Sequence, residues 1–367
     1  MYQFSVKREA RNSCKTKDMS KIAINGLGRI GRHVFKLILD NHPELELVAV
    51  NDLTDPKIIA HLIKYDSVYG RYEKDIEATD KELIVKSKKG EKRIAVLAVA
   101  DPAALPWRKL GVDVVLECTG KFVKYDDAAK HLIAGAKKVI ISAPSKDPDK
   151  IPSFLLGINA NEYDPAKADV MDMGSCTTNC LAPVVKVLND SFGIVKGFMS
   201  TIHAYTNDQR ILDFSHKDLR RARAAAINII PTSTGAAKVI NRVVPLRGKL
   251  DGIAFRVPVP TVSVVDFFCI LEKETSVDEV NAAFELAASK KPLKGILGYE
   301  KAPLVSTDFI GESHSSIFDP ALTMANGNMV KVVSWYDNEW GYATRLAEFA
   351  GFVGDKINDL AEKTRGI

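Results

Sequence analysis

The chain has 367 residues, of which 46% are hydrophobic and 26% are charged. This composition is typical of a folded globular protein, and the length suits two domains at about 100–200 residues per domain. The formal net charge of +5 comes mostly from residues 1–18, which carry five Lys or Arg against Glu9 and Asp18 and so contribute +3. The +2 left for the body is too small to indicate a nucleic-acid partner.

The cysteines, at positions 14, 118, 176, 180 and 269, form an odd set without dense spacing. Such a set argues against a disulfide framework and for a reducing compartment. Cys176 and Cys180 have no His/Cys cluster at zinc spacing beside them, so we expect no metal site. No apolar run approaches the ~18 residues of a membrane span, and the N-terminus has no apolar signal region. We therefore expect a cytoplasmic protein with no membrane partner.

Residues 1–18 have no hydrophobic period, and a fold-like pattern begins at Met19. The pattern indicates a disordered tail or a start assigned upstream of the true one. A basic targeting segment is the alternative, although Glu9 and Asp18 interrupt it.

A short apolar strand is expected at residues 21–25, and Gly26, Gly28 and Gly31 follow it directly and open a helix with apolar residues at 30, 34, 37 and 38. A second strand at 45–50 ends at Asp52. This is the dinucleotide fingerprint in its proper context: the glycines allow a tight turn and close approach to a pyrophosphate at the helix N-terminus. Asp52 would accept from the adenosine ribose hydroxyls and repel a 2′-phosphate, which favours NAD over NADP.

The strand–helix alternation continues at residues 112–117 and 138–141, and each apolar run ends in small polar residues. Ligands of a doubly wound sheet lie outside the carboxyl ends of its strands. Thr119, Gly120 and Ser142 are therefore candidate cofactor contacts, although turn chemistry alone also explains these residue types.

The run at residues 175–180, SCTTNC, precedes an apolar pattern at 181, 184, 185 and 188 with helical spacing. A thiol just ahead of a helix feels unpaired N–H groups and the positive end of the dipole, which makes Cys176 a candidate nucleophile. Pro183 would remove a hydrogen bond from a helix that began at Cys176, so we expect the regular helix to start nearer Leu181. Taken alone, a buried structural cysteine is the commoner interpretation.

Longer alternating strands follow, at residues 197–203 and 262–270, with helix between or after them. This mixture predicts an α+β second domain with a mixed or antiparallel sheet. The polar segment from Tyr205 to Arg223 has little period and is long for a loop, which is typical of a functional segment or one packed against a partner. The stretch after Asn338 predicts a C-terminal helix that could return to either domain.

Several motifs, in one order along the chain, resemble those of the phosphorylating glyceraldehyde-3-phosphate dehydrogenase family. They are residues 24–32 (INGLGRIGR), 64–67 (KYDS), 175–180 (SCTTNC), 203–206 (HAYT), 218–223 (DLRRAR), 231–236 (PTSTGA), 256–258 (RVP) and 335–341 (WYDNEWG). The resemblance runs from about Met19 to the C-terminus. It implies a Rossmann NAD-binding α/β domain at 19–175, an α+β catalytic domain at 176–337, and a helix at 338–367 that returns to the NAD domain. It also implies a homotetramer with the segment after Tyr205 at a subunit interface.

The reaction implied by the resemblance is oxidation of glyceraldehyde 3-phosphate to 1,3-bisphosphoglycerate with NAD and inorganic phosphate, through a thioester on Cys176 with His203 as proton acceptor. The resemblance assigns cofactor contacts to Gly26, Gly28, Arg29, Ile30, Gly31, Asp52, Thr119, Gly120, Ser142, Asn338 and Tyr342. It assigns the substrate phosphate to Thr206, Asp208 and Arg256, and the attacking phosphate to Ser175, Thr177, Arg221, Thr234 and Gly235.

Three alternatives stay open: the use of NADP, a sibling enzyme, and a protein of another class. Ser215 stands where NAD-type members often carry proline, and serine there is more typical of members that accept NADP, which conflicts with Asp52. A sibling enzyme, erythrose-4-phosphate dehydrogenase, shares the nucleophile. From other classes, a cysteine hydrolase or an NAD-binding scaffold without this activity would also carry parts of the pattern.

Overall fold

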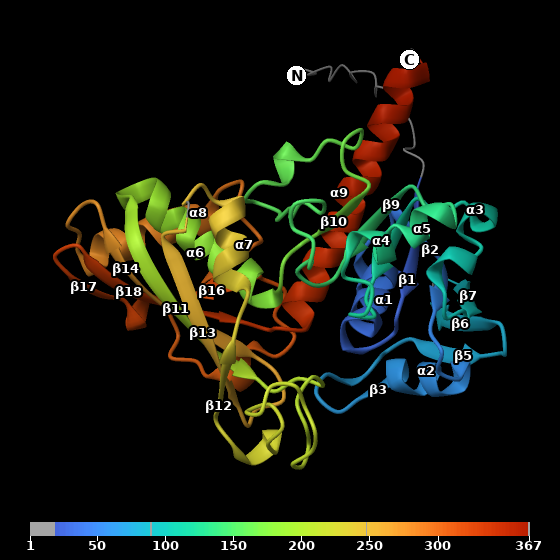
Figure 1. Cartoon of the computed structure of the whole chain (residues 1–367), viewed down its shortest axis with the longest axis horizontal. Coiled ribbons are helices and arrows are strands. Elements are labelled where there is room, and N and C mark those ends of the chain that lie inside the picture. Colours follow the sequence, from blue (N-terminus) through green and yellow to red (C-terminus); the bar gives the residue numbers. More distant parts are fainter. Residues whose placement is uncertain (1–18, 89, 247, 366–367) are drawn as a thin grey trace, which may run out of the picture.

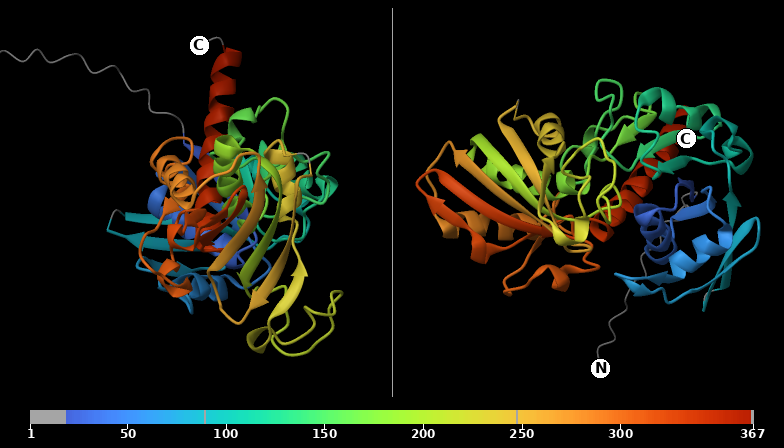
Figure 2. Two further views of the ribbon diagram at one scale, coloured as in Figure 1. Left: turned by 90° about the vertical axis from the view of Figure 1, so that its left-hand side faces the viewer. Right: turned by 60° about the horizontal axis from the view of Figure 1, so that its bottom comes forward.

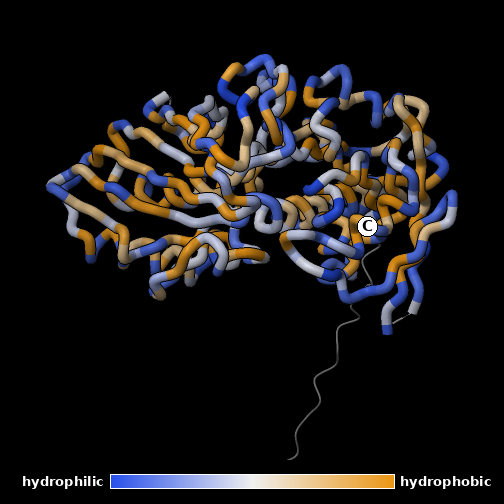
Figure 3. Tube along the Cα trace, turned by 90° about the horizontal axis from the view of Figure 1, so that it is seen from below, coloured by the Kyte–Doolittle hydropathy of each residue, from blue (hydrophilic) through white to orange (hydrophobic). Residues whose placement is uncertain are grey.

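The computed structural model describes residues 19–88, 90–246 and 248–365, so the prediction for residues 1–18 lies outside the described residues. The chain forms two lobes with one long helix, α9 (Trp340–Arg365), running beside the join between them (Figure 1). Figure 2 shows the same division from two further sides. Hydrophobic residues recur along the strands of both lobes, whereas the outer loops are largely hydrophilic (Figure 3).

The first lobe is built on a sheet in which β10, β9, β8, β1, β2 and β7 run parallel, and β6 and β5 continue it antiparallel. In sheet order these strands are β10 (Val170–Asp172), β9 (Lys138–Ile141), β8 (Val114–Glu117), β1 (Ser20–Asn25), β2 (Leu45–Asn51), β7 (Gly90–Leu97), β6 (Glu82–Ser87) and β5 (Asp75–Ala78). The strand β1 has no exposed residue, because both faces of the sheet are covered. The carboxyl ends of β1, β2 and β8 therefore meet at one edge.

Helices cover this sheet, and α9 is one of them. They are α1 (Arg29–Asn41), α2 (Pro56–Lys64), α3 (Trp107–Leu110), α4 (Tyr125–Ala128) and α5 (Lys130–Ile133), with a small hairpin of β3 (Tyr65–Asp66) and β4 (Gly70–Arg71) after α2. Helix α9 packs against α1, β1 and β8. Its Leu346 and Phe349 are buried in the same core as Val34 of α1. The end of the chain thus stabilises the lobe formed by its beginning.

The second lobe holds a mixed sheet with the order β12 (Ile230–Ser233), β13 (Leu250–Val257), β11 (Ile194–Ala204), β14 (Ser263–Leu271), β18 (Met329–Tyr336), β16 (Ser316–Phe318) and β15 (Leu297–Tyr299), and β17 (Met324–Asn326) pairs with β18. Strand β11 runs parallel to β13 and antiparallel to β14. Helices α6 (Cys176–Phe192), α7 (Ala236–Val243) and α8 (Val277–Ser289) pack together with one face of this sheet in a second core. The predicted fold class, a Rossmann domain plus an α+β domain, is confirmed.

Short 3-10 segments occur in the connections, at Pro102–Ala104, Ala160–Glu162, Ala225–Ile227, Ser306–Phe309 and Pro320–Leu322. The segment between β11 and β12 is otherwise irregular and projects from the lower edge of the second lobe in Figure 1. Within the described ranges, none of the helices combines the length and the apolar character needed to cross a bilayer.

The expectation that the regular helix starts near Leu181 is wrong. Helix α6 begins at Cys176, because Ser175 and Thr178 form a capping box in which each side chain accepts the other's backbone N–H. Pro183 lies inside the helix and costs it one hydrogen bond. Val184, Val185 and Leu188 are fully buried, and their packing offsets that loss.

Candidate active site

A cavity of about 690 Å³ opens between the two lobes beside the N-terminus of α6. Both lobes line it. From the first come Arg29, Ile30, Ser67, Val68, Cys118, Gly120, Ser142, Ala143 and Pro144, and from the second come Ser175, Cys176, His203, Tyr205, Thr206, Asn207, Asp208 and Pro260, with Asn338, Glu339 and Tyr342 at the start of α9. The structure thus brings most of the sequence-predicted site residues into one cleft.

Cys176 and His203 face each other, with 3.5 Å between Sγ and Nε2. The helix cap fixes the cysteine as the first residue of α6. The histidine comes from β11, where the period of two places Met199, Thr201 and His203 on the buried face and Phe198 on the exposed one. Because α6 covers that buried face, the His203 imidazole lies beside the N-terminus of α6.

Arg256 stands beside His203 because β11 and β13 are paired in parallel with these two residues opposite each other. Nδ1 of His203 lies 2.7 Å from both the Ala204 carbonyl oxygen and Nη1 of Arg256, and Nη1 also donates to that carbonyl over 3.0 Å. Nε of Arg256 is buried without a hydrogen-bond partner among the described residues. Part of this guanidinium is therefore uncommitted.

Burial and the nearby charges set the protonation of this pair. Burial, followed by the Arg256 charge, lowers the pKa of His203 to about 3, so the imidazole is neutral at neutral pH. Burial also raises the pKa of the Cys176 thiol, and this effect outweighs the lowering by the Arg256 charge and by hydrogen bonds with Thr177. The thiol and the imidazole are thus both neutral at neutral pH, so a thiolate forms only when the thiol proton moves to an acceptor such as Nε2.

Cys180 lies one helical turn beyond Cys176 and is fully buried. Its thiol donates to the Ser316 hydroxyl and the Ser334 carbonyl, both 3.7 Å away. Burial raises the pKa of this thiol to about 12. These contacts make it part of the core beneath the helix.

The hydroxyl groups predicted to bind phosphate differ in their hydrogen-bond partners and in whether they line the central cavity. Ser175 lines the cavity and caps α6. Thr177 is buried, and its hydroxyl lies 2.9 Å from the hydroxyl of Tyr336, which also contacts Thr201. Thr234 accepts the backbone N–H of Ala236 ahead of α7, where Gly235 is the N-cap. Thr234 and Gly235 lie outside the lining of the central cavity.

Arg221 connects the irregular segment to the cavity wall. It donates to Asp208, to the Thr232 hydroxyl over 2.8 Å and to the Ser233 carbonyl over 3.3 Å. Although burial raises the pKa of Asp208, the hydrogen bond and charge of Arg221 outweigh it and lower that pKa. Thr206 also lines the cavity, and its backbone N–H donates to the side-chain oxygen of Gln209. Arg221 itself is not part of the lining.

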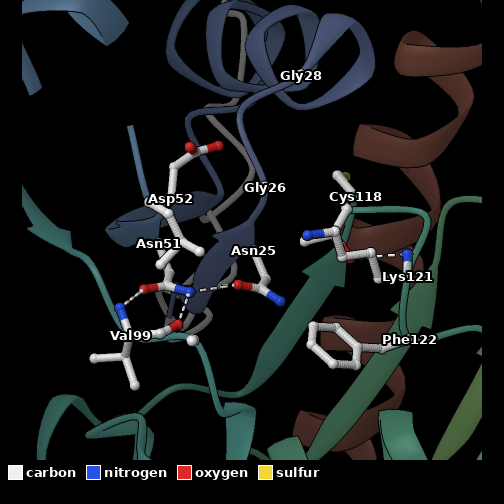
Figure 4. A pocket seen from close by; sticks show the side chains of 12 residues that line it. Asn25, Gly26, Gly28, Asn51, Asp52, Val99, Cys118, Lys121 and Phe122 are labelled. Atoms are coloured by element: carbon white, nitrogen blue, oxygen red, sulfur yellow. Dashed lines mark hydrogen bonds between the residues drawn. The ribbon is translucent and has the colours of Figure 1, made fainter. Parts of the chain in front are cut away.

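A second cavity of about 300 Å³ lies at the carboxyl ends of β1, β2 and β8 (Figure 4). It is lined by Asn25, Gly26, Gly28, Asn51, Asp52, Leu53, Val99, Ala100, Cys118, Thr119, Lys121 and Phe122. Cys118 lines both cavities, so the two are neighbours. Together they extend from Asp52 in the first lobe to Cys176 in the second.

The glycines of this turn fit a dinucleotide. A Cβ at Gly31 would collide with the Gly26 carbonyl, and Gly26 itself has φ +94°. At Gly28 and Gly120 a Cβ would meet no protein atom within 4 Å, although both residues line the cavities. The space beside these two glycines would therefore let a pyrophosphate approach the protein backbone closely.

The Asp52 carboxylate is partly used by the protein. It accepts the N–H of Leu27 over 2.7 Å and that of Thr54 over 2.9 Å. Burial raises its pKa, but these hydrogen bonds outweigh burial and lower it, so Asp52 is ionised at the cavity edge. The same carboxylate therefore fixes the glycine turn and presents negative charge to the cavity.

The start of α9 closes the cleft. Asn338 is buried, and its Oδ1 accepts the Ser263 hydroxyl over 2.9 Å. Tyr342 donates to the carbonyl of Gly174, two residues before the cysteine. The Arg29 guanidinium donates to both Asp66 and Glu339. These contacts connect the glycine turn, α9 and the nucleophile loop.

The sequence alone indicates no role for Tyr336, Ser263 or Glu339. Tyr336 holds Thr177 and Thr201 together, Ser263 orients Asn338, and Glu339 binds Arg29. Tyr336 and Glu339 belong to the 335–341 motif, which marked them as members of a motif without indicating their contacts. Ser263 carries no sequence signal, because its role depends on strand pairing.

The Rossmann domain and the cysteine–histidine pair in the cleft define an NAD-dependent dehydrogenase with a cysteine at its centre. Residues 20–125 match the NAD binding domain of glyceraldehyde 3-phosphate dehydrogenase, and residues 175–338 match the C-terminal domain of the same family. The chain belongs to the glyceraldehyde-3-phosphate dehydrogenase family.

Curated relatives agree over most of the chain. It is 56% identical to glyceraldehyde-3-phosphate dehydrogenase of Geobacillus stearothermophilus, over 92% of this chain and 98% of the relative. It is 54% identical to the enzyme of Streptomyces coelicolor, over 92% of this chain and 99% of the relative. Glyceraldehyde-3-phosphate dehydrogenase 1 of Bacillus subtilis is 55% identical over 92% of this chain and 98% of the relative.

Proposed function

We propose that the chain oxidises glyceraldehyde 3-phosphate to 1,3-bisphosphoglycerate with NAD and inorganic phosphate. The observation that carries this proposal is the 3.5 Å approach of the Cys176 thiol to His203 Nε2 in a cleft that adjoins a glycine-lined dinucleotide cavity. A thiol and a base at one end and a nucleotide site at the other are the requirements of cysteine-dependent aldehyde oxidation.

In this proposal Cys176 Sγ attacks the aldehyde carbon, and Nε2 of His203 accepts the proton that the thiol loses. This assignment uses the tautomer in which Nδ1–H donates to the Ala204 carbonyl, because that leaves the Nε2 lone pair facing Sγ. Nη1 of Arg256, which lies 2.7 Å from Nδ1 and can only donate, then directs its N–H to the same carbonyl. The N–H groups of Cys176 and Thr177, which precede the capped N–H of Thr178 in the first turn of α6, suit the oxygen that becomes anionic. The bound NAD supplies the acceptor for the hydride lost from the hemithioacetal carbon. Inorganic phosphate then attacks the resulting thioester, and the C–S bond breaks to release the acyl phosphate and the free cysteine.

Cofactor roles follow the lining of the two cavities. Gly26, Gly28, Arg29, Ile30 and Gly31 would hold the pyrophosphate, with the backbone N–H groups at the start of α1 as donors. Asp52 would select NAD through the adenosine ribose. Asn338 would bind the nicotinamide carboxamide with the help of Ser263, while Tyr342 would hold the α9 terminus in place. Thr119, Gly120 and Ser142 would line the path between these ends.

Two phosphate groups require separate cationic and hydroxyl donors. We assign the substrate phosphate to Thr206, Asp208 and Arg256, with Asp208 as an orienting group, since it is already paired with Arg221. The attacking phosphate is assigned to Ser175, Thr177, Thr234, Gly235 and Arg221. The Nε of Arg256, which is buried without a partner among the described residues, supports the binding of an anion in the cleft.

Steady-state assays with and without inorganic phosphate test the proposal. Formation of NADH from glyceraldehyde 3-phosphate should depend on phosphate, and product formation that is indifferent to phosphate would contradict it. A preference for erythrose 4-phosphate in the same assay would instead favour the sibling enzyme. Binding of NAD without turnover of either aldehyde would favour the scaffold.

We also propose that the chain works as a homotetramer in the cytoplasm. The support is exposed apolar side chains on the segment between β11 and β12, among them Ile211 (85% exposed) and Phe214 (71%), and Phe198 (68%) on the outer sheet face. Among the described residues, the cysteines at 118, 176, 180 and 269 are free, in keeping with a reducing compartment.

Light scattering tests the assembly. The double substitution Ile211→Ser with Phe214→Ser should lower the measured mass below that of four chains, because it removes apolar contact area. Ile133→Ser is the matched control, since Ile133 is similarly exposed (69%) but lies on α5 of the first lobe. A wild-type mass of one chain, or equal masses in all variants, would contradict the proposal.

A further inference from the structure

A chain of buried hydrogen bonds crosses the carboxyl edge of the first sheet and ends on the Glu117 carboxylate. Glu117 is the last residue of β8 and is 1% exposed. Its oxygens accept Asn25 Nδ2 over 2.5 Å, His131 Nε2 over 3.1 Å, the Thr119 N–H over 2.8 Å and the Thr119 hydroxyl. A buried carboxylate with this many donors is far better satisfied than one buried alone.

The direction of these hydrogen bonds is set at one end by the backbone. The N–H of Val99 donates to Asn51 Oδ1, which fixes the Asn51 amide so that Nδ2 donates to the Val99 carbonyl and to Asn25 Oδ1 (Figure 4). Asn25 Oδ1 is therefore an acceptor, and Asn25 Nδ2 must donate to Glu117.

The opposite end is set by an indole. Trp107 Nε1 is only a donor, and it lies 3.0 Å from His131 Nδ1, so Nδ1 accepts and His131 carries its proton on Nε2. Nε2–H then donates to Glu117. Asn25 Nδ2 also lies 3.4 Å from this nitrogen, because both donors converge on the same carboxylate oxygen. Both directions thus require Oε2 of Glu117 to accept hydrogen bonds.

The groups that Glu117 holds are walls of the dinucleotide cavity, although Glu117 is not one of them. Asn25 and Thr119 line the cavity. Thr119 also abuts the glycine turn, since a Cβ at Gly26 would lie 2.8 Å from both Thr119 N and Cγ2. A shift of Thr119 would therefore move the turn that faces the pyrophosphate.

We propose that Glu117 is a positioning residue for NAD: the hydrogen bonds that its carboxylate oxygens accept, with the His131 tautomer that Trp107 sets, hold Asn25, Thr119 and the glycine turn in place for the dinucleotide. This inference rests on the proposed function only in taking the cavity as the NAD site. It predicts that the neutral isostere Glu117→Gln binds NAD more weakly, because the new amide would turn an N–H₂ group toward donors that need an acceptor.

Calorimetry of NAD binding to the full-length protein tests this with Glu117→Gln, Trp107→Phe and the double variant. Glu117→Gln should weaken NAD binding by about tenfold or more, with kcat at saturating NAD within about threefold of wild type. Trp107→Phe alone should change NAD affinity by less than about threefold, since His131 can keep its Nε2–H. The double variant should bind NAD more tightly than Glu117→Gln, because His131 is then free to protonate Nδ1 and accept the new amide N–H at Nε2.

A purely structural role predicts the opposite for the double variant, because deleting the indole would only add damage. Wild-type NAD affinity in Glu117→Gln, or a double variant weaker than Glu117→Gln, overturns the proposal. If Glu117→Gln does not fold, solid-state ¹⁵N spectra of histidine-labelled wild-type protein still decide, with His131→Gln for assignment. Protonated Nε2 and unprotonated Nδ1 are expected at His131, and the reverse overturns the proposal. An inactive wild type that still binds NAD would instead count against the proposed reaction.

Discussion

The two ends of the cleft differ in how far their polar side chains are hydrogen-bonded to other protein groups. At the dinucleotide end, Asn25, Asn51, Glu117 and His131 hydrogen-bond to one another and leave the cavity walls fixed. At the chemical end, Cys176 Sγ lies 3.5 Å from Nε2 of His203, and Arg256 keeps a buried Nε without a partner among the described residues. The contrast indicates that the cofactor site is preorganised, whereas the reaction site keeps polar groups free for substrate and phosphate.

The largest expected effect is a loss of catalysis without a loss of NAD binding. Cys176→Ser should lower kcat by at least about 10⁴-fold, because the hydroxyl is a far weaker nucleophile beside the same imidazole. NAD affinity should stay within about threefold of wild type, since the dinucleotide cavity lies in the other lobe. Steady-state kinetics and calorimetry measure the two quantities. A matching loss of NAD affinity would show that the ends are not independent.

Removing the base should have the next largest effect. His203→Asn should lower both kcat and the alkylation rate of Cys176 by about 10²–10³-fold, because it removes the imidazole nitrogen that faces the thiol and takes its proton. Iodoacetamide kinetics followed by mass spectrometry at Cys176 provide the measurement. His61→Asn is the matched control, since His61 is an exposed residue of α2. Equal alkylation rates in wild type and His203→Asn would refute the role of His203.

The hydrogen bonds that Arg29 donates to Asp66 and Glu339 should contribute to the stability of the fold rather than to catalysis. Burial raises the pKa of Asp66, but hydrogen bonds from Arg29, Val68 and Tyr69 outweigh it and lower that pKa to about 2. Because the folded pKa lies below the unfolded value of about 3.9, the stabilisation is present above about pH 4 and is lost as pH falls toward about 2. Asp66→Asn should therefore lower the free energy of unfolding by about 2 kcal/mol at pH 7.

Urea unfolding at several pH values checks this expectation. The difference between wild type and Asp66→Asn should shrink below about pH 4, where the wild-type carboxylate gains a proton. Asp80→Asn is the control, because Asp80 is exposed in the turn between β5 and β6. A difference that stays constant from neutral pH down to about pH 3 would contradict the assignment to Asp66.

The smallest effect concerns cofactor choice at the preorganised end. Asp52→Asn should reduce the preference for NAD over NADP by about tenfold, because it removes a negative charge facing the 2′-phosphate while keeping an oxygen for the Leu27 N–H. Ser215→Pro restores the residue common in NAD-type members and should change the preference by less than about twofold. The ratio of kcat/KM with NAD to kcat/KM with NADP measures this preference in each variant. A larger effect from Ser215→Pro would place the selectivity in the irregular segment.

Features set by neighbours in the sequence could be predicted from it. The spacing of Gly26, Gly28 and Gly31 between a strand and a helix predicted the Rossmann turn, because that conformation depends on local φ angles and missing side chains. Ser175 and Thr178 lie within one turn, so the capping pattern also indicates a start of α6 at Cys176, and the expectation of a start near Leu181, which rests on Pro183, is wrong. Burial of the helix, which sequence spacing alone does not measure, accounts for that error.

Contacts between distant segments were decided by the tertiary structure alone. His203 reaches Cys176 because of the alternation of β11 and the helix that covers it, and Arg256 reaches His203 through strand register. Asn25, Glu117 and His131 meet only when β1, β8 and α5 pack together. Register and packing depend on the whole core, so the sequence by itself determined which chemical groups the protein carries, and the fold decided which of them touch.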